Sequence, residues 1–322
     1  MKLGIAGTGK IVQEALSVIL SAKPDKVYLA GREHSAERTE KLCRQYGLDG
    51  YFLDYEEMLE SDADTVYIAV PNSLHASFAG KALRAGKHVI LEKPATVRKE
   101  ELEDLFSLAG KQKRILVEAM SLHFLPAWQS LSGKIGDLGR IRLACFQFCQ
   151  YSSRYDAFLR GEVAPAFDTA CAGGALMDLG IYNIHAIVSL FGEPENVQYF
   201  PNMERGIDVS GILVMEYGDF QAVSIAAKEC QSPTSSTIQG TEGCIRIPVP
   251  ANQVDRYEIW DNAGHVQKYD YSGGKHRLFW EWQEFTRMIA EEDFGKVEEL
   301  EKISLQAMGV IDRARTYMRV EI

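Results

Sequence analysis

The sequence has few cysteines, and their spacing excludes the usual zinc sites. Six occur among 322 residues, with no Cys-x-x-Cys pair and no zinc-site spacing to histidine. We therefore expect reduced thiols, no bound metal and no zinc chemistry. Two of them, Cys145 and Cys149, lie in a predicted strand, where we expect them to pack as small apolar residues of the core.

Signals for membrane insertion and export are also missing. No apolar run approaches the roughly 20 residues that span a bilayer. The chain enters a strand at Leu3–Ala6 with no signal or transit sequence ahead of it. These features predict a cytoplasmic protein.

Basic residues are fewer than acidic ones. The chain has 35 Lys and Arg against 45 Asp and Glu, a formal net charge of −10. This balance argues against a nucleic-acid or membrane-surface partner, although a local basic pocket can still hold a phosphorylated cofactor. The composition, 46% hydrophobic and 25% charged, is that of a globular protein, and at about 150 residues per domain the length predicts two domains.

The first 120 residues alternate short apolar runs with helical patterns. Strands are predicted at 3–6, 27–30, 65–70, 88–91 and 115–117, and helices at about 11–22, 35–46, 55–60, 74–85 and 98–112. This alternation predicts a doubly wound parallel sheet with right-handed crossovers and helices on both faces. We expect an α/β domain over residues 1–119.

The pattern changes over residues 120–322. The predicted strands are 141–151, 196–203, 207–217, 220–228, 236–240, 243–247, 255–260 and 265–270, and the helices are about 174–190, 276–292 and 298–318. Hairpin turn residues between the strands predict an α+β domain with a large, mostly antiparallel open sheet. One face of this sheet can take the domain's own helices, and we expect the other to pack against a second copy in a dimer or tetramer. For the final helix, packing back on the N-terminal domain is left open as an alternative.

A glycine turn follows the first predicted strand. Gly7 and Gly9 fit the first two positions of Gly-x-Gly-x-x-Gly, whereas Val12 occupies the third, where a small residue is usual. A strand, a glycine turn and a helix N-terminus form a cradle for a pyrophosphate, because glycine lets the backbone approach and the free N–H groups stabilise the anion. The position of this turn at the start of an α/β half predicts a dinucleotide site.

The second predicted strand ends at Arg32. A carboxylate at this place accepts the ribose hydroxyls of NAD, whereas an arginine suits the 2′-phosphate of NADP. Arg32, with Ser35 and Arg38 close behind, favours NADP(H), and Glu33, one place later, keeps NAD(H) open.

Two further segments end strands of the same predicted sheet. Pro71, Asn72 and His75 follow one strand, and Glu92-Lys93-Pro94 ends the next. Carboxyl ends of parallel strands face the ligand crevice, so Lys93 would bring an ammonium to the nicotinamide. The residues expected at the cofactor are Gly7, Thr8, Gly9, Lys10, Ile11, Arg32, Pro71, Asn72, His75, Glu92 and Lys93.

These residues and several others together resemble the Gfo/Idh/MocA family of oxidoreductases, named for glucose–fructose oxidoreductase and inositol dehydrogenase. The matching segments are Gly7–Gly9, Val70–His75, Ala85–Val89, Glu92–Pro94, Glu118–Met120 and Gly173–Tyr182. The resemblance implies an N-terminal Rossmann domain and a C-terminal domain for substrate binding and oligomerisation.

The resemblance also implies roles for individual residues. The lysine of Glu-Lys-Pro is catalytic in such proteins, which gives that role to Lys93, and the acidic residue after the glycines corresponds to Asp178. Many members carry a catalytic histidine four residues later, whereas this chain has Tyr182, as in the dihydrodiol dehydrogenase and glucose–fructose oxidoreductase branches. His123 stands where relatives often have arginine.

The spacing of Asp178, Tyr182 and His185 places them on one face of a predicted helix, which we interpret as a polar cavity wall. His185 could instead be a hydrogen-bonded core histidine. The segment 151–174 is expected to line the substrate side. The residues expected at the substrate are Lys93, Asp178, Tyr182, His185, Tyr155 and Phe167.

The predicted function is hydride transfer between a nicotinamide and a secondary alcohol or ketone of a small sugar, polyol or dihydrodiol. Tyr182 would move the proton, with its pKa lowered by the ammonium of Lys93, and Asp178 would orient a substrate hydroxyl or hold Lys93. The alternative is a non-catalytic dinucleotide or sugar sensor of the same fold, which would have no need of these three groups. No helix-turn-helix segment or basic tail indicates a nucleic-acid partner.

Overall fold

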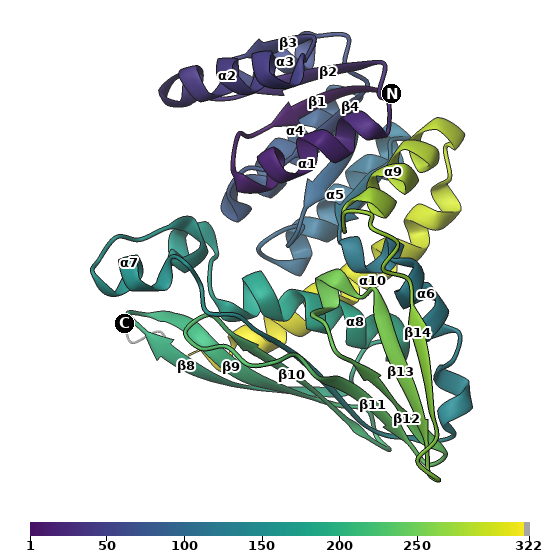
Figure 1. Cartoon of the computed structure of the whole chain (residues 1–322). Helices are drawn as coiled ribbons and strands as arrows, with labels where there is room; N and C mark the ends of the chain where they lie inside the picture. The colour runs from purple at the N-terminus through teal and green to yellow at the C-terminus, as the bar shows by residue number, and fades with distance from the viewer. Residues whose placement is uncertain (319–322) are drawn as a thin grey trace. The chain divides into compact units, whose positions relative to one another are not determined.

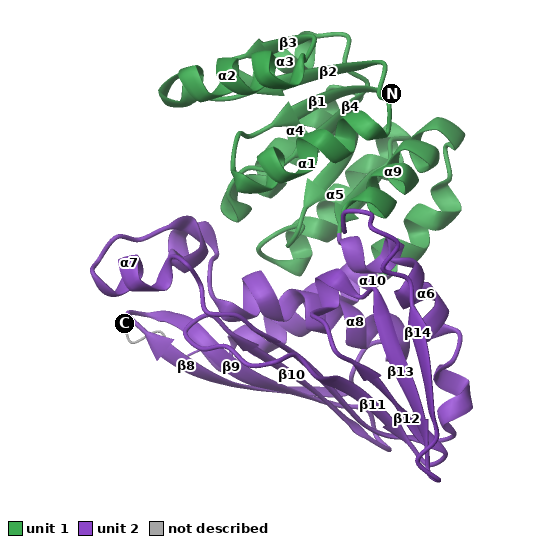
Figure 2. Cartoon of the chain, in the orientation of Figure 1, with its two compact units in different colours: residues 1–119, 278–302 green, residues 120–277, 303–322 purple. Residues whose placement is uncertain are grey.

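The structure, a computed structural model, describes residues 1–318. The chain forms two compact units, shown in Figure 2. The first comprises residues 1–119 and 278–302, and the second comprises residues 120–277 and 303–322.

The first unit is built on a parallel six-stranded sheet (Figure 1). Its strands lie in the order β3 (Gly50–Phe52), β2 (Lys26–Ala30), β1 (Lys2–Ala6), β4 (Thr65–Ile68), β5 (His88–Glu92) and β6 (Leu116–Ala119). The central strands are buried almost completely, as expected of a sheet covered by helices on both faces. The predicted doubly wound sheet is confirmed, and β3 is the one strand of it that the sequence pattern missed.

Helices cover this sheet and include one from far along the chain. They are α1 (Lys10–Ser21), α2 (Ala36–Tyr46), α3 (Tyr55–Glu60), α4 (His75–Arg84), α5 (Lys99–Gln112) and α9 (Phe279–Glu291). Helix α9 contacts α1, and its Trp282 ring packs edge-on against Tyr67 of β4, with the centroids 5.1 Å apart. Residues 278–302 thus belong to the core of the first unit.

The second unit contains an eight-stranded sheet. Its strands lie in the order β14 (Val266–Asp270), β13 (Arg256–Asp261), β12 (Gly243–Ile247), β11 (Ser236–Gly240), β7 (Ile141–Cys149), β10 (Gln221–Ala227), β9 (Ile207–Glu216) and β8 (Asn196–Glu204). All neighbours pair antiparallel except β7 and β10. The predicted fold class, a Rossmann sheet followed by a large and mostly antiparallel sheet, is confirmed.

Helices lie over one face of this second sheet (Figure 1). They are α6 (Pro126–Ser132), α7 (Tyr155–Leu159), a π-helical turn (Leu176–Gly180) that runs into α8 (Ile181–Phe191), and the end of α10 (Phe294–Arg315). The stretch Thr169–Phe191 is long and apolar enough to cross a membrane, although 72% of its most apolar window is buried within the folded chain. The expectation that no apolar run approaches that length is therefore wrong here, and the burial is that of a core helix.

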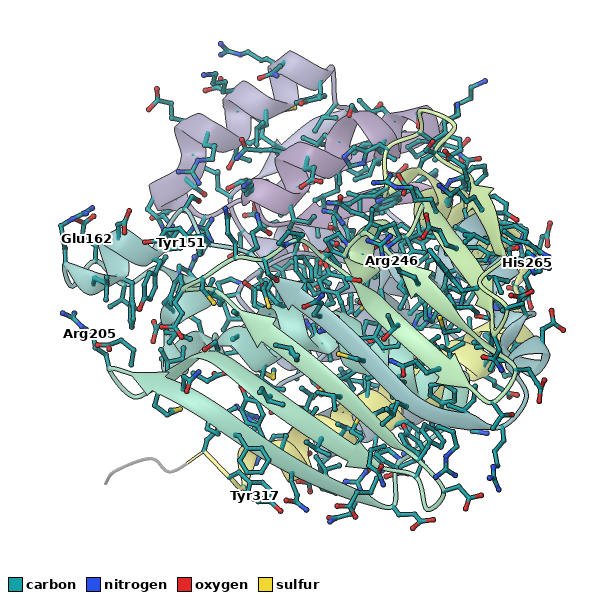
Figure 3. All side chains as sticks on the ribbon, turned by 60° about the horizontal axis from the view of Figure 1, so that its bottom comes forward. Tyr151, Glu162, Arg205, Arg246, His265 and Tyr317 are labelled. Carbon is teal, nitrogen blue, oxygen red and sulfur yellow. The ribbon has the colours of Figure 1, made fainter. Side chains whose placement is uncertain are left out.

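No helix of residues 1–318 covers the opposite face of this sheet in Figure 3. Leu143, Phe200 and Ile212 are 48%, 57% and 45% exposed there. Cys145 and Cys149 lie on the same face of β7 as Leu143, whereas the buried Ala144, Phe146 and Phe148 lie on the other face. The prediction that these cysteines pack in the core is therefore wrong, because they point to the half-exposed side of β7.

Candidate functional site

The cradle after β1 is formed by backbone at the carboxyl edge of the parallel sheet. Gly7 has φ +122°, its N–H donates to the Ala30 carbonyl at 2.9 Å, and an added Cβ would lie 2.4 Å from the Ala69 carbonyl oxygen. Only glycine fits this combination of left-handed backbone and close approach. Gly9 caps α1 without a side chain, and an added Cβ there would meet nothing within 4 Å. The first N–H groups of α1 are therefore open to an anion.

Val12, in the third position of the glycine pattern, is fully buried in α1. The larger side chain is accommodated in the core of the first unit. The departure from glycine thus leaves the strand, turn and helix arrangement intact.

Arg32 follows the end of β2, and β2 is the neighbour of β1 in the sheet. Arg32 therefore lies at the same edge of the sheet as the glycine cradle. Its backbone N–H donates to Ser35 Oγ at 3.0 Å, which fixes the turn. Its side chain is exposed and forms no ion pair with any residue of the described part of the chain. An arginine held this way is available to a phosphate.

His75 joins the two other segments at this edge. It is 1% exposed, and its two ring nitrogens each lie 2.9 Å from a carbonyl oxygen, that of Pro94 for Nδ1 and that of Val70 for Nε2. Burial lowers the pKa of His75, and because a neutral ring has a single N–H, it donates to one of these two carbonyl oxygens and lies close to the other. Although the sequence analysis placed His75 at the cofactor, these contacts make it a brace between the ends of β4 and β5.

Glu92 and Lys93 end β5 at the same edge. Glu92 is buried, and its carboxylate accepts a hydrogen bond of 2.5 Å from the Tyr67 hydroxyl and one of 3.2 Å from the Lys93 backbone N–H. Lys93 is half-buried and precedes a cis peptide bond to Pro94. Glu118 of β6 in turn accepts from the Ala95 N–H at 2.9 Å. The turn that presents Lys93 is thus held by side chains from β4, β5 and β6.

In the second unit, Asp178 lies in the π-helical turn before α8. Its Oδ2 accepts a hydrogen bond of 2.9 Å from Lys228 Nζ, and its side chain is 34% exposed. The same ammonium donates to the Ala166 carbonyl and lies 4.3 Å from the centroid of the Phe167 ring. Asp178 therefore has a cationic partner within its own unit, which the sequence analysis did not identify.

The start of the π-helical turn is fixed by a second buried carboxylate. Asp208 of β9 accepts from the Leu176 N–H at 2.7 Å and from the Tyr199 hydroxyl at 2.8 Å. Burial raises the pKa of Asp208 to about 6. Gly174 has φ +112°, and an added Cβ would lie 2.0 Å from Asp208 Oδ1, so the glycine pair before the helix leaves room for this carboxylate.

Tyr182 and His185 belong to the next turns of α8. Tyr182 is 7% exposed, with its ring 5.9 Å from that of Phe148, and His185 is fully buried. Nε2 of His123 lies 3.0 Å from Nδ1 of His185, so one of the two rings donates a hydrogen bond to the other. Helix α8 is buried on nearly all sides, and the π-helical turn replaces the continuous α-helix that the spacing of Asp178, Tyr182 and His185 assumed.

The segment 151–174 forms a small aromatic cluster. Phe167 is 2% exposed and stacks on Phe158 at 4.8 Å, beside Ile207 and Val209. Tyr155 covers this cluster and donates to Glu229 at 3.3 Å. In this structure Phe167 is a packing residue, and Tyr155 is the more accessible of the two aromatic residues expected at the substrate.

Each unit thus gathers its own set of the expected residues. The first holds the glycine turn, Arg32 and Lys93, and the second holds Asp178, Tyr182 and His185. Within residues 1–318, no three His, Cys, Asp or Glu side chains come together in a way that could hold a metal ion.

Comparison with known proteins agrees with this arrangement. Residues 1–120 match the family described as "Oxidoreductase family, NAD-binding Rossmann fold", and residues 133–246 match the "GFO/IDH/MocA C-terminal domain". Scyllo-inositol 2-dehydrogenase (NADP(+)) IolU of Bacillus subtilis is 33% identical over 322 residues, which cover 99% of this chain and 98% of the relative. The chain belongs to the Gfo/Idh/MocA family of oxidoreductases.

Other Gfo/Idh/MocA members extend the comparison. Trans-1,2-dihydrobenzene-1,2-diol dehydrogenase of Xenopus tropicalis is 30% identical over 260 residues, covering 77% of this chain and 75% of the relative. Among solved structures, levoglucosan dehydrogenase in complex with NADH and levoglucosan has a TM-score of 0.83 at 18% identity, covering 98% and 97% of the two chains. KijD10, a 3-ketoreductase from Actinomadura kijaniata with NADP and TDP-benzene, has a TM-score of 0.80 at 24% identity and the same coverage. These two structures share the fold, and the predicted family is confirmed.

Replacing Asp208 by asparagine tests the buried carboxyl group. Its pKa rises from 3.8 to about 6 on folding, so its contribution to stability is complete below the lower value and is lost as the pH rises through the higher one. Between about pH 4 and 7, the free energy of unfolding of the wild type should fall by about 3 kcal/mol relative to Asp208→Asn. Urea unfolding of both proteins across this range measures the difference, and parallel pH profiles would contradict it. Tyr199→Phe removes a hydrogen bond to the carboxylate and should enlarge the pH dependence.

Proposed function

We propose that this protein is an NAD(P)-dependent dehydrogenase or reductase of CH–OH groups. It transfers a hydride between the nicotinamide and a secondary alcohol or ketone of a small sugar, polyol or dihydrodiol. The observation that carries the proposal is the edge of the parallel sheet, where the glycine cradle follows β1, Arg32 follows β2 and the Glu92–Pro94 turn ends β5. Full-length similarity to an NADP-dependent inositol dehydrogenase supports the substrate class.

The cofactor is NADP(H) in preference to NAD(H). The open N-terminus of α1 and the space at Gly9 fit a pyrophosphate, and the exposed Arg32 fits the 2′-phosphate. When bound, the nicotinamide supplies the hydride chemistry. The name of IolU refers to NADP(+) and the KijD10 structure contains NADP, which agrees with this preference, whereas the levoglucosan dehydrogenase structure contains NADH.

The chain's own residues supply charge and a proton. The Lys93 ammonium stabilises negative charge that develops on the substrate oxygen, and the Tyr182 hydroxyl gives or takes the proton of that oxygen. Asp178, a third exposed beside its buried cation, orients a substrate hydroxyl. His185, on the same helix as Tyr182, lies 3.0 Å from His123 between their ring nitrogens and is a candidate for substrate contact or for the core of the unit.

A non-catalytic sensor of the same fold is the second candidate. A sensor needs the dinucleotide cradle but neither a positioned lysine nor a tyrosine and carboxylate held in one helix. The braced turn at Lys93 and the paired Asp178 favour the enzyme. A cytoplasmic location is part of the proposal and suits free thiols at all six cysteines.

The exposed sheet face is an interface between copies of this chain. Phe200, Ile212 and Ile225 are register partners on β8, β9 and β10, so they form an apolar row across three strands. Leu143 and Cys145 of β7 continue the half-exposed surface. An apolar surface of this kind marks an association site in a soluble protein.

Replacing Lys93 or Tyr182 tests the reaction. Lys93→Met and Tyr182→Phe should each lower kcat at least about 100-fold, because each removes a group that acts in the transition state, while the Kd for NADPH changes little. The assay follows NADPH formation from NADP+ with scyllo-inositol, levoglucosan or trans-1,2-dihydrobenzene-1,2-diol. Lys87→Met and Tyr51→Phe, at positions outside the proposed site, are the controls. Full activity in both site variants would refute the assignment, and an inactive wild type that binds NADPH would favour the sensor.

A charge on the apolar row tests the interface. Ile212→Glu should convert the oligomer to a monomer of about 36 kDa, because it buries a carboxylate against the partner copy. Sedimentation velocity measures the change, with Tyr51→Glu on the exposed surface of the first unit as the control. A wild-type protein that sediments as a monomer would contradict the proposal.

A further inference from the structure

Lys228 stands at an unusual place for a lysine. It follows the last residue of β10 and is 2% exposed, and no other lysine or arginine in residues 1–318 is buried to this degree. A buried ammonium is costly unless charged and polar groups surround it. The groups around it include Asp178, the Ala166 carbonyl and the face of Phe167, and the buried Asp208 carboxyl group also interacts with it electrostatically.

We propose that Lys228 is a positioning residue that fixes the Asp178 carboxylate and the segment 152–171 as one unit. The proposal rests on the proposed function, in which Asp178 orients a substrate hydroxyl. Lys228 acts through Asp178 and the segment and does not itself touch the reacting atoms.

Lys228 fixes the orientation of the Asp178 carboxylate. Oδ2 is held at 2.9 Å by an ammonium that is itself shielded from water, whereas about a third of the side chain is exposed. One edge of the carboxylate is therefore fixed in the interior, and the remainder is presented in one orientation. A group held in this way loses little freedom when it binds a hydroxyl.

Lys228 and its neighbour Glu229 also hold the segment 152–171. Its beginning is tied to Lys228 by a hydrogen bond of 2.8 Å from the Ser152 N–H to the Lys228 carbonyl. Its later part is tied by the bond from Lys228 Nζ to the Ala166 carbonyl and by the Phe167 ring. Glu229, the next residue, accepts from Tyr155 between these two points. Lys228 and Glu229, directly after β10, thus hold the segment at Ser152, at Tyr155 and at Ala166.

The strand itself gives this stretch a rigid base. The Lys228 N–H donates to the Val209 carbonyl at 2.8 Å, and the Glu229 carboxylate accepts from Ser210 at 2.6 Å. The ties at Ser152 and Tyr155 do not use the ammonium. Its loss should therefore release Asp178 and the later part of the segment, around Ala166 and Phe167, while the sheet and the beginning of the segment remain in place.

The first test needs no substrate. In Lys228→Met, amide hydrogen exchange over 164–171 should increase at least about tenfold, whereas exchange in β7 to β10 stays unchanged. Asp178→Asn should lower the melting temperature more than Lys228→Met does, because it removes the carboxylate that is hydrogen-bonded to a buried ammonium, and Lys228→Met/Asp178→Asn should recover part of the loss. Lys87→Met, which removes a lysine that also donates to two carbonyl groups, is the matched control.

The second test uses turnover of NADP+ with whichever of scyllo-inositol, levoglucosan and trans-1,2-dihydrobenzene-1,2-diol the wild type oxidises. Lys228→Met should lower kcat/KM for that alcohol about 100-fold, the cost of a carboxylate misplaced by about 1 Å, and leave the Kd for NADPH within about twofold. Lys228→Arg should restore part of the activity, which a merely structural defect elsewhere would not do.

The outcomes separate this proposal from the proposed function. Wild-type kcat/KM in Lys228→Met, or exchange over 164–171 no faster than in Lys87→Met, overturns the positioning role. A wild type that binds NADPH but is inactive on all three alcohols favours the sensor over the proposed function. The exchange and melting comparisons then test, without any substrate, whether Lys228 holds Asp178 and the later part of the segment. Increased exchange together with the loss of kcat/KM and its partial rescue by arginine supports both.

Discussion

Parallel strand pairing is the constraint on which the first unit depends. Because all six strands run in one direction, every strand ends at the same edge, and the segments that follow β1, β2, β4 and β5 are brought to that edge together. Gly7 joins two of them through the Ala30 carbonyl, and His75 joins two others through the carbonyls of Val70 and Pro94. The cradle, the arginine and the lysine are therefore consequences of one sheet topology.

In the second unit, buried charged groups, and not the direction of the strands, hold the candidate site residues in place. Lys228 and Asp178 compensate each other at the end of β10, and Asp208 holds the start of the π-helical turn only 32 residues away in sequence. Such groups are costly when unpaired, so their partners are constrained as strictly as core side chains. A helix otherwise buried in apolar surroundings is thereby forced to present Asp178 in one orientation.

Much of this arrangement could be predicted from the sequence, because strand–helix alternation and glycine turns are local signals. The strand β3 was missed because three residues carry little periodicity. Lys228 was missed because a lysine after an apolar strand resembles an ordinary solvated strand end, and only the fold brings Ala166 and Asp178 to it. The same reason explains Cys145, whose face of the sheet was assigned without knowledge of which side the helices cover.

The most direct test of the account is a fluorescence titration of the purified protein with NADPH and NADH in parallel. The account predicts saturable binding of one NADPH per chain, at least about tenfold tighter than NADH, and loss of that preference in Arg32→Ala. Within residues 1–318 the Arg32 side chain forms no ion pair that this substitution would remove. Equal or tighter binding of NADH would contradict the role of Arg32. Binding of neither dinucleotide would contradict the assignment of the sheet edge itself.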